Sequence, residues 1–152
     1  MRFNDLIIAK HFSGRAAGAD DVARELVVLP RARDAGRALH GRCVAGIIAA
    51  RPGNTLGIAG VAPDARVLGL RACWERPLGG TTVCDTLSLA KALTFAIENR
   101  ANVINMSLTG PADRLLAGLI DLGVARGITI VAAVDAKNPR ASFPAFVTGV
   151  VP

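Results

Sequence analysis

Hydrophobic positions between residues 66 and 134 alternate between short continuous apolar runs and longer stretches with the spacing of amphipathic helices. Continuous apolar runs are typical of strands that are covered on both faces of a parallel sheet. The helical spacing covers Thr86–Asn99 and a second stretch that opens at Gly110-Pro111 and closes at Gly127. The predicted strands are Arg66–Leu70, Val103–Met106 and Ile128–Val134. This order predicts a three-layer α/β fold, with a mostly parallel sheet and helices on both of its faces.

Both predicted helices carry end signals. Asp85 immediately precedes the first helix and has the side chain of a good N-cap. Pro111 falls near the first turn of the second helix, where its missing N–H is tolerated, and Gly127 falls at the C′ position after the last turn. The apolar stripes are Leu89, Leu93, Ala96 and Ile97 in the first helix and Leu115, Leu116, Leu119 and Ile120 in the second. Each helix is therefore expected to bury one face against the sheet.

The chain before residue 66 is less regular. Residues 1–39 are poorly patterned, with Phe3–Ala9 and Glu25–Leu29 as candidate strands, whereas residues 40–152 form the expected α/β core of a single domain. His40–Ala50 predicts a helix that is unusually rich in small residues. Glycine inside a helix is unfavourable by about 1 kcal/mol relative to alanine. We therefore expect neighbouring backbone to approach this helix closely at its small residues, which are Gly41, Ala45, Gly46, Ala49 and Ala50.

Composition excludes two classes of protein. With 152 residues, 51% of them hydrophobic, the chain can bury the core of one domain and is not a disordered tail. No apolar run approaches the roughly 20 residues that a membrane span needs. The first 14 residues carry scattered charges and only a short apolar patch, so we predict no signal peptide and leave the compartment open.

The charge balance raises the question of nucleic acid. There are 18 Lys and Arg against 12 Asp and Glu, which gives a net charge of +6. The arginines are scattered singly, and the chain has no Tyr and one Trp, so it lacks the basic stripe and aromatic platform of a nucleic-acid interface. We therefore expect a solvated basic surface, with neither nucleic acid nor a membrane as a partner.

Three cysteines are present, and none forms a CxxC pair. Cys73 and Cys84 flank a loop rich in Gly and Pro, so they form either a disulfide in an oxidising compartment or two buried thiols, and the sequence leaves both open. Cys43 follows His40 by three residues, but a metal site would need two further ligands and His11 is the only other histidine. We predict no metal site and no cofactor.

Four segments carry a resemblance to a known family. HGRCVAGIIAA, GNTLGIAGVAPDARVLGLRA, ANVINMSLTG and ARGITIVAAV follow one another from about His40 to Val134. In order and spacing they resemble the subtilisin-like serine peptidases (subtilases, peptidase S8). The resemblance implies a partial subtilase catalytic domain of residues 1–152, a serine endopeptidase activity, a polypeptide or extended peptide as substrate, and full-length relatives that are exported.

The resemblance also implies roles for individual residues. His40 matches the catalytic histidine of the family, which acts as general base. Its place at a helix N-terminus favours the neutral ring that can accept a proton, although a histidine there can also simply cap the helix. Ser107, Leu108 and Thr109 match the segment that pairs with the substrate backbone. The alternative for them is an ordinary strand-to-helix loop.

Several family motifs are missing from this chain. No Asp stands in a DTG-like turn, and none of the four serines stands in a GTS-like turn, so neither the catalytic Asp nor the nucleophile is present. Asp135 and Ala136 occupy the positions of the family's Gly-Asn pair, whose Asn stabilises the oxyanion, and Asn138 is a possible substitute donor. The loop of residues 53–57, which resembles a calcium loop of some subtilases, offers too few oxygen ligands.

Two functional interpretations follow from these absences. The first is a truncated endopeptidase domain, a piece of a longer protease that is inactive on its own. The second is a non-catalytic pseudoprotease that binds peptides or another partner. An incomplete sheet also exposes strand edges, through which the chain can form a homodimer.

Overall fold

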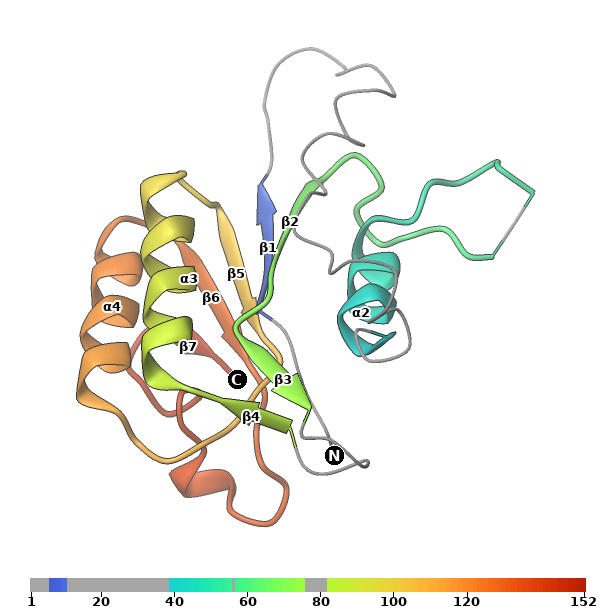
Figure 1. Cartoon of the computed structure of the whole chain (residues 1–152). Helices are drawn as coiled ribbons and strands as arrows, with labels where there is room; N and C mark the ends of the chain where they lie inside the picture. Colours follow the sequence, from blue (N-terminus) through green and yellow to red (C-terminus); the bar gives the residue numbers. More distant parts are fainter. Residues whose placement is uncertain (1–5, 11–38, 56, 76–81) are drawn as a thin grey trace.

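The computed structural model describes residues 6–10, 39–55, 57–75 and 82–152 (Figure 1). The strands are β1 (Leu6–Lys10), β2 (Arg66–Leu70), β3 (Cys73–Glu75), β4 (Thr82–Cys84), β5 (Val103–Met106), β6 (Thr129–Ala132) and β7 (Val150–Val151). The helices are α2 (Leu39–Ala49), α3 (Thr86–Glu98), α4 (Arg114–Ala125) and the short 3-10 helix η3 (Pro139–Ala141). The predicted strand Glu25–Leu29 lies outside the described residues, and so do Phe3–Asp5 of the predicted first strand.

Five strands form the main sheet in the order β2-β1-β5-β6-β7. β5 pairs parallel with β6, and β6 pairs parallel with β7. β1 is antiparallel to both of its neighbours, β2 and β5. Because two strands that are antiparallel to the same strand share a direction, β2, β5, β6 and β7 all run the same way. The predicted mostly parallel sheet is confirmed, with the reversed β1 as a feature that the hydrophobic pattern did not indicate.

The helices form two further layers. In Figure 1, α3 and α4 cover one face of the sheet, and α2 lies on the other face, where it packs on β1 and β2. The main core lies between α3, α4 and the sheet. Its fully buried side chains include Leu93 from α3, Ile104 and Met106 from β5, Ile120 from α4 and Ile130 from β6. The three-layer α/β architecture is therefore confirmed.

Two aspartates set the starts of α3 and α4. Asp85 caps α3 as predicted: its carboxylate accepts hydrogen bonds from the Ser88 N–H at 2.8 Å and from the Ser88 hydroxyl at 2.7 Å. The predicted start of α4 at Gly110-Pro111 is wrong by about one turn. Asp113 caps α4 by accepting from the N–H groups of Leu115 and Leu116 at 2.9 and 3.1 Å, whereas proline offers no such acceptor. Gly127 follows the C-cap of α4 with φ +77°, as predicted.

The segment between β2 and α3 contains a hairpin that the sequence pattern did not indicate. β3 and β4 form a separate two-stranded antiparallel sheet in which Cys73 faces Cys84. These two cysteines form a disulfide, one of the two alternatives that the sequence left open. A bridge across a sequence separation of 11 residues is expected to contribute about 3 kcal/mol by restricting the unfolded chain.

The close backbone approach expected along α2 occurs at its C-terminal end. For Gly46 the expectation is wrong, because a Cβ atom at this residue would meet no atom within 4 Å. Gly60 instead lies against the helix end: its N–H donates to Ala50 O at 2.8 Å, and a Cβ there would stand 2.5 Å from Ala50 N.

Among the described residues, no helix combines the length and apolar character required to cross a membrane.

We predict opposite effects for two glycine substitutions. Gly60→Ala should destabilise the fold by about 1–3 kcal/mol, because the added methyl meets backbone that cannot move aside without lifting the loop from α2. Gly118→Ala is the matched control: it is exposed within α4, where a Cβ meets nothing within 4 Å, and should stabilise by about 0.5–1 kcal/mol. Urea unfolding of both variants measures the difference, and equal effects would contradict the packing described for Gly60.

The capping aspartates predict the acid sensitivity of the fold. Hydrogen bonds from Ser88 lower the pKa of Asp85, and the hydrogen bond from the Thr86 hydroxyl, followed by that from the Leu116 N–H, lowers the pKa of Asp113. A carboxyl whose pKa is lower in the folded state stabilises the fold above its ordinary pKa of 3.8 and loses this effect as the pH falls further. Thermal unfolding should therefore shift to lower temperature below about pH 4. Asp113→Asn, which can still cap the helix, should show a weaker pH dependence in this range.

Candidate functional site

The shared direction of four strands brings their following loops to one edge of the sheet. β2, β5 and β6 end at Leu70, Met106 and Ala132, and these ends lie on the same side because the strands run the same way. We call this side the carboxyl edge. It carries the β3–β4 hairpin after β2, the segment Ser107–Gly110 after β5 and the segment Ala133–Phe143 after β6. In sheets of this type, ligands bind beyond the carboxyl ends of the strands.

The start of α2 lies at the same edge. The loop that follows α2 folds back onto the C-terminal end of this helix. There Val61 N donates to Ile47 O at 3.0 Å, and Ala62 N donates to Ile48 O at 2.7 Å. β2 then begins close to this end of the helix. An 11-residue helix and a 5-residue strand both span about 16 Å, so α2 starts level with the end of β2 (Figure 1). His40 is the second residue of α2 and so belongs to the carboxyl edge by its backbone position. Its role as general base stays a prediction.

The predicted substrate-pairing segment is anchored at both ends. The Leu108 side chain is buried in the core, and its N–H donates to Met106 O at 2.8 Å. Gly110 N donates to Phe143 O at 3.0 Å. Between these anchors Thr109 is exposed, and it takes part in none of the hydrogen bonds found within the described part of the chain. The backbone of Thr109 is therefore available to pair with a ligand, whereas the Leu108 side chain serves the core.

Ser107 begins this segment and is half-buried. Its hydroxyl oxygen accepts a hydrogen bond from the Asn105 side-chain amide at 2.8 Å. Asn105 lies within β5, one residue before the strand ends, so the amide reaches the edge from inside the sheet. This contact holds the first residue of the segment against the strand from which it emerges.

A buried serine organises the neighbouring segment after β6. Ser142 is 2% exposed, and its hydroxyl accepts from Asp135 N at 2.8 Å and donates to Asn138 O at 2.9 Å. Asn138 N in turn donates to Asp135 O at 3.0 Å. The next residue, Phe143, forms an antiparallel bridge with Gly110, so the two segments lie side by side. Sequence reasoning did not single out Ser142, because one serine in a loop belongs to no periodic pattern.

These contacts also define the surroundings of the residues at the family's Gly-Asn positions. The N–H of Asp135 is used by Ser142, and its carboxylate accepts from Lys137 N at 2.9 Å. Asp135 therefore acts as a turn residue, and Ala136 has no polar side chain to donate to a developing oxyanion. Asn138, the predicted substitute, is held through its backbone by both Asp135 and Ser142.

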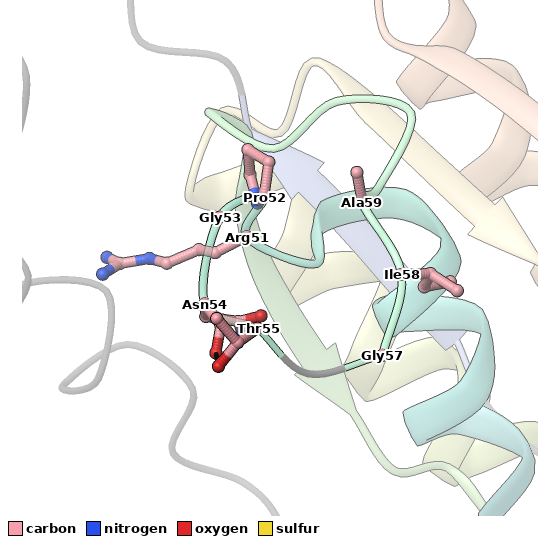
Figure 2. Close-up of a pocket in the computed structure, with 8 residues that line it drawn as sticks. All are labelled: Arg51, Pro52, Gly53, Asn54, Thr55, Gly57, Ile58 and Ala59. Atoms are coloured by element: carbon pink, nitrogen blue, oxygen red, sulfur yellow. Dashed lines mark hydrogen bonds between the residues drawn. The ribbon is translucent and has the colours of Figure 1, made fainter.

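A separate hollow lies at the other end of α2. It has a volume of about 330 Å³ and is formed by the loop that follows the helix (Figure 2). The guanidinium group of Arg51 points away from it, and the Thr55 hydroxyl donates to the neighbouring Asn54 carbonyl at 2.6 Å. Since the loop that forms the hollow leaves α2 at the end opposite its start, the hollow is not part of the carboxyl edge. Within the described ranges, no three His, Cys, Asp or Glu side chains gather as metal ligands.

The chain matches a family model and many curated proteins. The model described as the subtilase family matches residues 14–142. Minor extracellular protease Epr from Bacillus subtilis is 33% identical over 115 residues, which cover 74% of this chain and 17% of that protein. Thermitase from Thermoactinomyces vulgaris is 32% identical over 114 residues, which cover 74% of this chain and 39% of that protein. The chain thus spans well under half the length of these relatives.

Solved structures confirm the fold. The structure of the prenylagaramide maturation protease PagA aligns with a TM-score of 0.54 and 23% sequence identity, covering 70% of this chain and 39% of that one. At this level of identity the likeness shows the three-layer α/β fold and nothing finer.

The relatives also include a protein named extracellular protease from Xanthomonas campestris, 36% identical over 120 residues, so some longer relatives are exported.

Ser142 provides a stability test of the carboxyl edge. Ser142→Ala leaves the Asp135 N–H and the Asn138 carbonyl without their buried partner, which should destabilise the fold by about 1–3 kcal/mol in urea unfolding. Ser88→Ala is the control, because this serine is only half-buried and the backbone bond from Ser88 N to Asp85 remains. A loss for Ser142→Ala no larger than for Ser88→Ala would contradict the organising role of Ser142.

Proposed function

Because the chain belongs to the subtilase family, we propose that its carboxyl edge binds an extended polypeptide segment as part of a serine endopeptidase catalytic domain. The observation that carries the proposal is that Thr109 is an exposed residue between two anchored residues and that its backbone makes no hydrogen bond with the described part of the chain. An extended peptide that lies along Ser107–Gly110 would pair with this backbone as an added strand. His40, at the start of α2, would then stand at the same edge as the bound peptide.

In this proposal the chain supplies the base and the peptide site but no nucleophile. Peptide hydrolysis by the family mechanism needs a Ser to attack the carbonyl, a His to take its proton and an Asp to orient the imidazole. The described serines make other contacts: the Ser88 hydroxyl donates to Asp85, the N-cap of α3, Ser107 accepts from Asn105, and Ser142 is buried in its loop. The chain by itself is therefore expected to be inactive by the triad route.

The alternative function is a non-catalytic peptide-binding module, a pseudoprotease. Asp135 and Ala136 favour it, because neither side chain can donate to an oxyanion. Both interpretations include peptide binding, and they differ in hydrolysis. When polypeptide segments that carry the missing Ser and Asp are added to the chain, only the endopeptidase domain would hydrolyse the bound peptide.

Two further parts of the proposal concern location and assembly. The Cys73–Cys84 disulfide fits a protein that acts in an oxidising compartment, in line with its exported relatives.

Within the described residues, β2 and β7 are the two outer strands of the main sheet. Their outer edges are the candidates for a homodimer contact.

Peptide binding tests the proposal directly. Fluorescein-labelled oxidised insulin B chain, an extended polypeptide, should bind the purified chain saturably in fluorescence anisotropy. Thr109→Pro removes the N–H that would pair with the peptide and should weaken binding about tenfold, the equivalent of one hydrogen bond of about 1.4 kcal/mol. Thr109→Ala keeps that N–H and should bind like the natural chain. The absence of saturable binding, or equal losses in both variants, would overturn the proposal.

The absence of hydrolysis is tested on the same protein. A fluorophosphonate probe, which labels activated serines, should leave the chain unlabelled. Labelling that disappears in His40→Ala would show that a nucleophile is present and would contradict this part of the proposal.

A further inference from the structure

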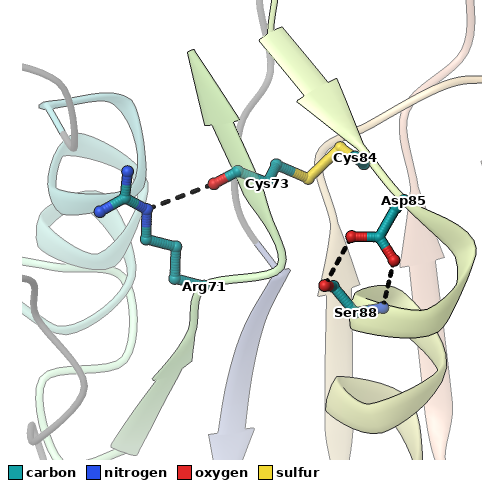
Figure 3. Close-up of a disulfide and its surroundings, with 5 residues drawn as sticks. All are labelled: Arg71, Cys73, Cys84, Asp85 and Ser88. Atoms are coloured by element: carbon teal, nitrogen blue, oxygen red, sulfur yellow. Dashed lines mark hydrogen bonds between the residues drawn. A yellow bond between two sulfur atoms is a disulfide. The ribbon is translucent and has the colours of Figure 1, made fainter. Parts of the chain in front are cut away.

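We propose that the Cys73–Cys84 disulfide makes peptide binding at the carboxyl edge depend on thiol redox state. This rests on the proposed function, since it concerns the regulation of the same site. The disulfide lies in the hairpin that follows β2, and it immediately precedes Asp85, the N-cap of α3 (Figure 3). It therefore joins the carboxyl edge to the start of a core helix.

The hairpin depends on the disulfide for its order. β3 and β4 have three residues each, and among the described residues they pair only with one another. Two-stranded hairpins without further support are at best marginally stable in water. One side is held independently, because Cys73 is 2% exposed in the core and its carbonyl accepts from Arg71 Nε at 3.3 Å. The disulfide extends this anchorage to Cys84 on the other strand.

Hydrogen bonds extend the connection from Cys84 to the peptide site. Asp85, the next residue, caps α3 through Ser88, and Thr86 follows as the first residue of the helix. The Thr86 hydroxyl donates to Asp113 Oδ2 at 2.6 Å, and the other carboxylate oxygen of Asp113 caps α4. Asp113 lies three residues after Gly110, where the peptide-pairing segment ends. Loss of order in the hairpin is thus transmitted to the far end of that segment.

The two sulfurs differ in their accessibility. Cys84 is half-buried, whereas Cys73 lies in the core, so an incoming thiolate reaches the Cys84 sulfur more easily. Attack by one thiolate of a small dithiol forms a mixed disulfide with Cys84 and releases the Cys73 thiolate. The second thiol of the reagent then displaces Cys84. The protein disulfide gains two electrons and two protons to become two thiols, and the dithiol is oxidised to a cyclic disulfide.

The test uses the full chain with Cys43→Ser, which leaves the pair as the only cysteines. Anisotropy with labelled oxidised insulin B chain, which contains no reducible bond, gives the affinity before and after dithiothreitol and after reoxidation. Reduction should weaken binding about tenfold or more, and reoxidation should restore it. Adding Cys73→Ser and Cys84→Ser should give the weak affinity at once, with no response to dithiothreitol. Far-UV circular dichroism confirms that α3 and α4 remain folded.

Hydrogen exchange of the same protein, without peptide, tests the coupling independently of binding. Reduction should accelerate exchange of the amides of Gly110, Leu115 and Leu116, which donate to Phe143 or to Asp113 in the oxidised protein. Unchanged exchange at these amides, or a twofold or smaller change in affinity, would overturn the redox proposal. If exchange responds but no peptide binds in either state, the proposed function fails and the coupling stands.

Discussion

The candidate site depends on the shared direction of β2, β5, β6 and β7. Strands that run the same way end on the same side, so the loops after β2, β5 and β6 are brought together although they lie far apart in the sequence. The core that holds this arrangement is built from side chains such as Ile104, Ile130 and Leu93, which are almost fully buried between the sheet and its helices. Substitutions that weaken this core would therefore also disturb the carboxyl edge.

Polar contacts give that edge its detailed shape. Ser142 satisfies two backbone groups within one loop, and the bridge between Gly110 and Phe143 fixes this loop beside the segment after β5. Asp85 and Asp113 cap neighbouring helices, and Thr86 connects the two caps. The two backbone groups that Ser142 satisfies would be costly to leave unpaired beside a buried side chain. These contacts together order the edge.

Asp135 and Ala136 stand at the positions of the family's Gly-Asn pair, whereas Ser107–Thr109 match the segment that is predicted to pair with substrate. Asp135 is used to form a turn, and Ala136 offers no donor, so this part of the edge is organised for structure. Thr109 is exposed between two anchors, and its backbone makes no hydrogen bond with the described part of the chain. Recognition of an extended peptide needs only such backbone groups, whereas hydrolysis needs several side chains in one geometry. The proposed peptide binding therefore requires fewer groups in a fixed geometry than hydrolysis does.

By itself, the sequence determined the local features of this protein. β2 and β5 lie at their predicted residues, α3 begins after its predicted cap Asp85, and Gly127 ends α4, because hydrophobic period and capping act over a few neighbouring residues. The family motifs also pointed to His40 and Ser107–Thr109 as site residues, and their roles stay predictions. Only the tertiary structure decided the reversed direction of β1, the pairing of Cys73 with Cys84, the burial of Ser142 and the close contact at Gly60. Each of these depends on which distant parts of the chain come together, and a pattern read over a few adjacent residues carries no information about such contacts.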